Sequence, residues 1–135
     1  MAFGVKLALD QVNAAGGVNG NTLRVVLHDD GYKVDATVKL ANQSLADDRP
    51  IALIGTLGTP NNEALRAVLE RERIPLIGAR TGATSLANHP YIFRVKATFR
   101  DETARIVEQL LSHGMNRIGV VYQNDSFGMD GLRGV

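Results

Sequence analysis

Apolar residues recur along this chain with two different spacings, and the two spacings alternate from one end to the other. Spacings of three and four residues place side chains on one face of a helix and therefore predict helices. Such segments are residues 5–12, 34–45, 60–73, 100–114 and 126–135, with a shorter helix around 85–87. Short apolar or alternating runs predict strands at 23–27, 51–55, 74–78, 91–95 and 117–125.

The order of these elements predicts the fold class. Strands that alternate with helices at short intervals favour an α/β fold with a doubly wound, mostly parallel sheet covered on both faces. Val26, between the alternating Val25 and Leu27, indicates that the first of these strands is buried on both sides. A doubly wound domain usually begins with a strand, whereas this chain begins with a helix and ends in another. We therefore expect a domain that is cut at both ends.

Composition and charge exclude several classes of function. The chain has 135 residues, of which 44% are hydrophobic and 21% charged, with a formal net charge of +1. Aromatic residues make up only 5% and no basic patch stands out, so we expect no nucleic-acid partner. The absence of cysteine removes thiolate catalysis, zinc–thiolate sites and disulfides. The first residues lack the basic start and uninterrupted apolar region of a secretory signal.

Motifs for enzymatic chemistry are missing from the sequence. There is no G-x-G spacing for a dinucleotide, no Gly-Lys pair for a phosphate-binding loop and no G-x-S-x-G elbow, so we expect neither an enzyme nor a cofactor. His28, His89 and His113 are too widely separated for a helical metal-binding pair. The pair Asp29-Asp30 could hold a cation or contact a ligand, but capping of a loop is the favoured role.

Two loops that follow predicted strands carry the candidate chemistry. In "GTLGTP", Thr59 before Pro60 predicts a helix start, with the threonine hydroxyl as N-cap. The free amides of such a first turn attract a carboxylate or phosphate, although simple capping is the favoured interpretation of this motif taken alone. In "GARTGAT", Arg80 offers a guanidinium group that can form two parallel hydrogen bonds to a carboxylate, and Thr81 offers a hydroxyl.

These loops are expected to converge on one site. Parallel strands end at the same edge of a sheet, and open α/β sheets bind ligands outside the carboxyl ends of their strands. Glycines in both loops allow a ligand to approach the backbone closely. Two convergent loops with hydrogen-bond donors and no catalytic base predict a binding site for a small anion rather than a catalytic centre.

The residues also resemble a known family. The pattern of helix, "NAAGGVNG", strand, "DD", helix, strand and hydroxyl-rich loop in residues 4–61 resembles the N-terminal lobe of type I periplasmic solute-binding proteins. The subgroup is the branched-chain amino-acid (Leu/Ile/Val-binding) type that serves ABC transporters. The stretches "RVKATFRDETARIVEQLL" and "RIGVVYQNDSFGMDG" resemble the crossover and the opening of the second lobe, so the resemblance covers essentially all of the chain.

The resemblance implies a clamshell that encloses an amino acid or similar small carboxylate between two lobes. Residues 1–97 would form the N-terminal lobe, and residues 98–135 the hinge crossover and the start of the second lobe. The implied ligand-binding residues are Thr59, Arg80, Thr81, Gly82 and Phe127. Leu/Ile/Val-binding proteins carry a small residue near Arg80 and a threonine near Gly82. Arg80 therefore either contacts an extra acidic or polar group of the ligand or points into solvent.

The resemblance further implies a membrane permease as partner, a periplasmic or extracytoplasmic location and no cofactor. The family begins with a strand and a ligand-contacting loop that are missing before residue 5, so two sheet edges are expected to be unpaired. We therefore expect low stability of the chain alone, or self-association through those edges. The alternative function is a ligand-sensing domain of a regulator or receptor with the same fold.

Overall fold

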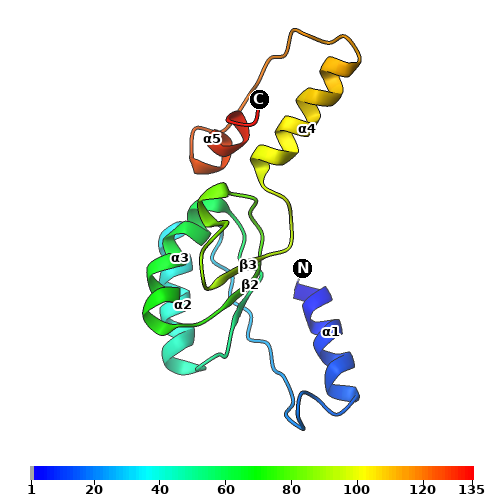
Figure 1. The fold of residues 1–135 in the computed structure, drawn as a ribbon. Helices are drawn as coiled ribbons and strands as arrows, with labels where there is room; N and C mark the ends of the chain where they lie inside the picture. Colours follow the sequence, from blue (N-terminus) through cyan, green and yellow to red (C-terminus); the bar gives the residue numbers. More distant parts are fainter. Residues whose placement is uncertain (1) are drawn as a thin grey trace.

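The computed structural model describes residues 2–135, whose helices and strands alternate from α2 to α4, as the sequence predicts for that part (Figure 1). The elements are α1 (Ala2–Ala14), α2 (Val34–Asp47), β1 (Leu53–Ile54), α3 (Thr59–Glu72), β2 (Leu76–Ala79), the 3-10 helix η1 (Thr84–Leu86), β3 (Ile92–Arg94), α4 (Phe99–Ser112) and α5 (Ser126–Leu132). Within residues 2–135, no helix has the length and apolar character needed to cross a membrane.

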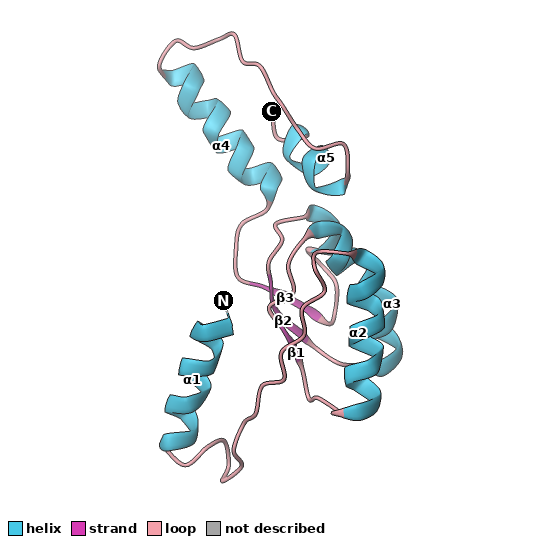
Figure 2. Ribbon diagram, turned by 180° about the vertical axis from the view of Figure 1, so that it is seen from behind, coloured by secondary structure: helices cyan, strands magenta, loops and turns pink. Residues whose placement is uncertain are grey.

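The strands form a three-stranded parallel sheet in the order β1-β2-β3. Leu76 in the central strand pairs with Leu53 on one side and with Ile92 on the other. Helices α2 and α3 lie on one side of this sheet and α1 lies on the opposite side (Figures 1 and 2). The predicted α/β class with a parallel sheet is thus confirmed.

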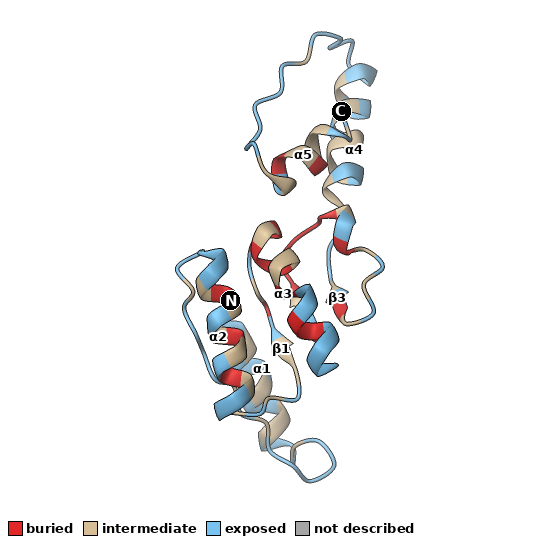
Figure 3. Cartoon of the chain, turned by 90° about the vertical axis from the view of Figure 1, so that its left-hand side faces the viewer, coloured by how far each residue is buried: buried red, intermediate tan, exposed pale blue. Residues whose placement is uncertain are grey.

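The hydrophobic core lies between the sheet and the helices α2 and α3. Its largest fully buried members are leucines from α3, β2 and η1, namely Leu65, Leu69, Leu76 and Leu86. Buried positions accordingly concentrate on α2, α3 and the segment after β2, whereas residues 3–14 of α1 include none (Figure 3). This packing fixes the start of α3 relative to the end of β2, which is where the two candidate loops lie.

The strand predicted at residues 23–27 is wrong. The backbone there is not assigned to a strand, and within residues 2–135 no backbone hydrogen bond joins it to β1. Between this segment and β1 lies an open cavity of about 400 Å³, lined by apolar side chains that include Val25, Leu27 and Ile54. Leu27 is 63% exposed, so this segment is not buried on both faces as its pattern indicated. A strand requires a hydrogen-bonded neighbour, and this segment has none.

The strand predicted at residues 117–125 is wrong for the same reason. This segment is not assigned to a strand, and Val120, Val121 and Tyr122 are all exposed. Its apolar residues face solvent because, among the described residues, no strand lies beside it.

Helices α4 and α5 pack against each other at one end of the sheet (Figures 1 and 2). The Thr98 side chain caps α4 by accepting a hydrogen bond from the Asp101 backbone N–H (3.0 Å). The Thr103 hydroxyl of α4 donates to the Gly131 carbonyl of α5 (2.8 Å). These contacts place the first turns of both helices beside the loops that follow β1 and β2.

Candidate ligand-binding cleft

A cleft of about 440 Å³ opens where the loops after β1 and β2 meet the crossover and the first turns of α4 and α5. It is lined by residues from segments far apart in the sequence: Tyr32, Leu57, Gly58, Thr59, Ala79, Arg80, Val95, Lys96, Phe99, Gln123 and Phe127. The cleft therefore lies at the carboxyl ends of the parallel strands, where the sequence predicts a binding site.

One wall is the N-terminus of α3, and its cap differs from the prediction. Gly58, not Thr59, is the N-cap; its φ of 95° lies in a region that favours glycine. Thr59 and Pro60 are the first helical residues, and no side chain caps the helix. The Asn62 side chain instead donates to the Gly58 carbonyl (2.5 Å). Because the Thr59 hydroxyl is not used in capping, it is free to bond elsewhere.

The two candidate loops lie side by side, as the sequence predicts. The Arg80 backbone N–H donates to the Thr56 carbonyl (2.8 Å), and the hydroxyls of Thr59 and Thr81 are 2.7 Å apart. Both threonines are buried, at 2% and 0% exposed. Thr59 lines the cleft, whereas Thr81 does not and its hydroxyl also accepts from the Ala83 N–H (3.0 Å).

Gly82 lies behind the cleft and joins the loop to the crossover. Its carbonyl accepts a hydrogen bond from the Phe99 N–H (2.9 Å). A Cβ at this position would come within 2.7 Å of the Ala97 carbonyl oxygen, so only glycine fits this close approach. Gly82 and Thr81 are thus placed to support the cleft rather than to line it, and their contact with a ligand stays a prediction.

Two cations face the cleft. Arg80 is exposed at its rim and, like Lys96, belongs to the residues that line it. The Lys96 ammonium is 3.0 Å from a Glu102 carboxylate oxygen and 4.4 Å from the centre of the Phe99 ring. Lys96 is therefore partly neutralised by its partner, which leaves Arg80 as the stronger anion-binding group of the pair.

Aromatic rings complete the opposite wall. Phe127, predicted from the resemblance, lines the cleft at the start of α5 and packs edge-to-face on Phe99 of α4, with ring centroids 4.8 Å apart. Tyr32 lines the cleft from the loop before α2. Sequence reasoning missed Phe99 and Tyr32. The only signal for Tyr32 was its place directly after the "DDG" turn.

The acidic pair Asp29-Asp30 caps this loop, as the favoured interpretation predicts. The side chains accept hydrogen bonds from the Gly31 and Tyr32 N–H groups, each at 2.9 Å. Burial raises the pKa of Asp30, but hydrogen bonds from the Thr37 hydroxyl, the Tyr32 N–H and the Asn61 amide outweigh it. The net effect holds the pKa below its ordinary value of 3.8. Asp30 thereby positions Tyr32 beside the cleft.

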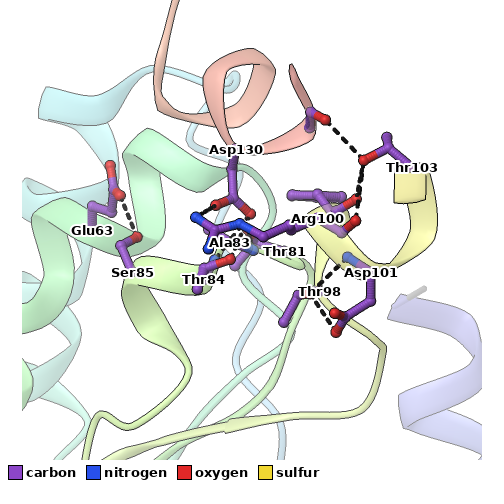
Figure 4. A network of polar contacts seen from close by, with 12 residues as sticks. Glu63, Thr81, Ala83, Thr84, Ser85, Thr98, Arg100, Asp101, Thr103 and Asp130 are labelled. Carbon is purple, nitrogen blue, oxygen red and sulfur yellow. Dashed lines mark hydrogen bonds and ion pairs between the residues drawn. The ribbon is translucent and has the colours of Figure 1, made fainter. Parts of the chain in front are cut away.

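A buried carboxylate on α5, Asp130, was not anticipated from the sequence. It lies on α5, is 4% exposed and accepts hydrogen bonds from the backbone N–H and the hydroxyl of Thr84 (Figure 4). No short-range pattern could have indicated this pair, because the two residues are 46 positions apart.

The arrangement suits the binding of a small anion with an apolar portion. It combines a helix N-terminus, a hydroxyl, a guanidinium and aromatic rings around one cavity. Within residues 2–135, no group of three or more histidine or acidic side chains could hold a metal ion.

Comparisons with known proteins show the family and the fold of this chain. The sequence profile of a family described as "Periplasmic binding protein" matches residues 1–135. Among solved structures, a substrate-binding periplasmic protein from Ralstonia solanacearum is 39% identical with a TM-score of 0.92. The match covers 97% of this chain and 38% of that protein.

Two further relatives carry the names of branched-chain amino-acid binders. A possible leucine/isoleucine/valine-binding protein from Rhodopirellula baltica SH 1 is 31% identical, with a TM-score of 0.88 over 97% of this chain and 36% of its own. The Leu/Ile/Val-binding protein of Escherichia coli (strain K12) is 27% identical over 93% of this chain and 35% of its own length. The chain thus spans little more than a third of these relatives.

Proposed function

Because this chain belongs to the family of periplasmic binding proteins, we propose that it is part of an extracytoplasmic solute-binding protein of an ABC importer. The resemblance noted in the sequence is confirmed by the family match. The observation that carries the functional proposal is the cleft, in which Thr59, Arg80 and Phe127 converge from three separate segments.

The proposed ligand is an amino acid or a similar small carboxylate. The Thr59 hydroxyl and the amides of the first turn of α3 would bind the carboxylate. Phe127 and Tyr32 would pack on the apolar part, and Arg80 would pair with any further acidic group. The names of the Rhodopirellula baltica and Escherichia coli relatives support a branched-chain amino acid, whereas Arg80 supports a more acidic ligand.

The proposed mechanism is non-catalytic. Residues 1–97 would form one lobe, and residues 98–135 would contain the crossover and the start of the second. Ligand binding favours a closed arrangement of the two lobes, and a membrane permease recognises that arrangement. The location that this role requires is the periplasm or another extracytoplasmic compartment.

A thermal-shift screen of the 135-residue chain against amino acids and small carboxylates tests the proposal. A ligand present at about 100 times its Kd stabilises the folded state by about 2.7 kcal/mol, which raises the melting temperature by several degrees. The Arg80→Gln variant tests specificity: it should weaken binding of L-glutamate more than binding of L-leucine. A chain that melts cooperatively but is stabilised by no amino acid or carboxylate contradicts the proposed function.

We also infer self-association through the free sheet edge. β1 is paired only with β2 among the described strands, and its other side faces the apolar cavity beside residues 23–27. Ile54, which lines this cavity, is 46% exposed, and Ile51, just before the strand, is 81% exposed. An exposed edge with apolar side chains pairs readily with another copy of the same chain.

A further inference from the structure

The Asp130 carboxylate touches three elements at once. One oxygen accepts hydrogen bonds from the backbone N–H (3.1 Å) and the hydroxyl (3.0 Å) of Thr84 in η1. The other lies 3.9 Å from a guanidinium nitrogen of Arg100 in the first turn of α4. Asp130 itself belongs to α5, so a single side chain links α5, α4 and the segment after β2 (Figure 4).

A buried carboxylate is costly unless donors satisfy it. The Asp130 side chain is 6% exposed, and no buried side-chain oxygen or nitrogen among the described residues lacks a hydrogen-bond partner. The backbone N–H and the hydroxyl of Thr84 satisfy this carboxylate, and they belong to η1 after β2 rather than to α5. Displacing α5 from η1 would leave a carboxylate without these donors, so the contact resists such a displacement.

The Thr84 end of the contact belongs to the loop that shapes the cleft. Every residue from 81 to 84 is held by a specific bond: the Thr81 hydroxyl by Thr59, the Gly82 carbonyl by the Phe99 N–H, and the Ala83 carbonyl by Arg94. Asp130 supplies the fourth of these bonds and the only one of them from α5. Arg80, at the rim of the cleft, directly precedes this loop.

The Asp130 end of the contact belongs to α5, which carries the Phe127 wall of the cleft. Phe127 precedes Asp130 by three residues in α5, so the position of the carboxylate fixes the position of the ring. We propose that Asp130 is a positioning residue, whose bonds to Thr84 set the distance between the Arg80 wall and the Phe127 wall of the cleft. This proposal rests on the proposed function, because it assigns the ligand to this cleft.

The test compares Asp130→Asn and Thr84→Val with two controls. Thr84→Ser keeps both donors, the backbone N–H and the hydroxyl, and should behave like the wild type. Glu63→Gln, like Asp130→Asn, removes the charge from a carboxylate that accepts a hydrogen bond, here from the Ser85 hydroxyl at 2.6 Å. This bond lies one residue further along the same turn but within the α/β part (Figure 4). Titration with L-leucine and with L-glutamate by calorimetry, at a temperature where all variants are folded, should show about tenfold weaker binding only for the first two variants.

A second readout needs no bound molecule. The chain has no cysteine, so Arg66→Cys on α3 and Glu108→Cys on α4 introduce a unique pair of spin-label sites, both exposed. Asp130→Asn and Thr84→Val should broaden the distance distribution between these labels, and Glu63→Gln should leave it narrow. If Asp130→Asn does not fold, Thr84→Val tests the same bond from the other side.

The outcomes separate this proposal from the proposed function. A lower melting temperature with unchanged affinity and unchanged label distances would show a purely structural role for Asp130 and overturn the proposal. Absence of binding by the wild-type chain would overturn the proposed function. In that case broadened label distances would still support the coupling of the two walls by Asp130, and unchanged distances would refute it.

Discussion

The hydroxyls of Thr59 and Thr81 lie within hydrogen-bonding distance of each other, and their other hydrogen bonds suggest different roles for the two residues. Thr81 accepts a hydrogen bond from Ala83, and its own hydrogen can be donated to Thr59, 2.7 Å away. A hydroxyl has one donor and two acceptor positions. With Thr81 as donor, the hydrogen of Thr59 is available to the cleft, which it lines. Thr59 would then contact the ligand, and Thr81 would orient Thr59.

Substitution of either threonine should therefore weaken binding to a similar degree. Thr59→Val and Thr81→Ala are each expected to lower the affinity for the best amino acid of the thermal-shift screen about tenfold, the equivalent of one hydrogen bond to a charged group. The double variant should be little worse than either single one, because both remove the same pair. Calorimetry that finds additive losses would separate the two residues, and unchanged affinity for Thr81→Ala would remove it from the site.

Asp30 should make stability depend on pH in the acid range. The pKa of Asp30 is lower in the folded chain than its ordinary value of 3.8, so the unfolded chain binds the proton more readily. The stabilising contribution is fully present above pH 3.8 and is lost as the pH falls through the folded-state pKa. Urea unfolding should show that the free energy of unfolding of the wild type exceeds that of Asp30→Asn by a constant amount above that pH. Below that pH the difference between the two free energies should shrink. A difference that grows in acid would contradict this assignment.

At the scale of elements, the sequence predicts helices better than strands, and the reason is physical. A helix satisfies its backbone hydrogen bonds internally, so the apolar spacing in 5–12, 34–45 and 100–114 sufficed to locate α1, α2 and α4. Strands depend on neighbours. Residues 51–55, 74–78 and 91–95 have parallel partners and form β1, β2 and β3. Residues 23–27 and 117–125 have equally apolar patterns, but within residues 2–135 they pair with no strand.

The residues of the cleft were likewise predicted where local sequence determines their position and missed where long-range packing does. The loops after β1 and β2 were predicted to converge because strand direction fixes where parallel strands end. Phe127 followed from the family resemblance alone. Phe99, Lys96 and Asp130 were missed, because their positions depend on how α4 and α5 pack against segments distant in the sequence. The N-cap of α3 was misplaced by one residue, since Gly58 has no side chain that signals capping.

The start of α3 should be sensitive to substitution of its N-cap. Gly58→Ala would adopt an unfavourable φ of 95°, and its Cβ would lie 2.7 Å from the Tyr32 ring and 2.8 Å from the Asn61 amide oxygen. We expect destabilisation by about 1–3 kcal/mol, together with displacement of Tyr32 from the cleft. Gly4→Ala in α1 is the matched control. It has open space for a Cβ and should stabilise by roughly 0.5–1 kcal/mol in urea unfolding.

For the whole molecule, the free edge of β1 should determine the association state. Ile54→Lys places a charge beside the apolar cavity and should shift the chain toward monomer, because charged edge strands resist pairing. Sedimentation velocity over a tenfold range of concentration measures this shift. Val121→Lys, in the other exposed extended segment, is the control and should leave the association unchanged. A wild-type chain that remains monomeric throughout would contradict pairing through this edge.

The parallel register also has a consequence for the order of events during synthesis. Leu76 pairs with Leu53, which precedes it in the sequence, and with Ile92, which follows it. Both partners lie within a few tens of residues, so the sheet forms by closing short loops. The three strands β1, β2 and β3 have been made once Arg94 leaves the ribosome, whereas Asp130 emerges only after α4 has been made. The α/β part should therefore gain protection from proteolysis on stalled nascent chains before the contact between Asp130 and Thr84 can form.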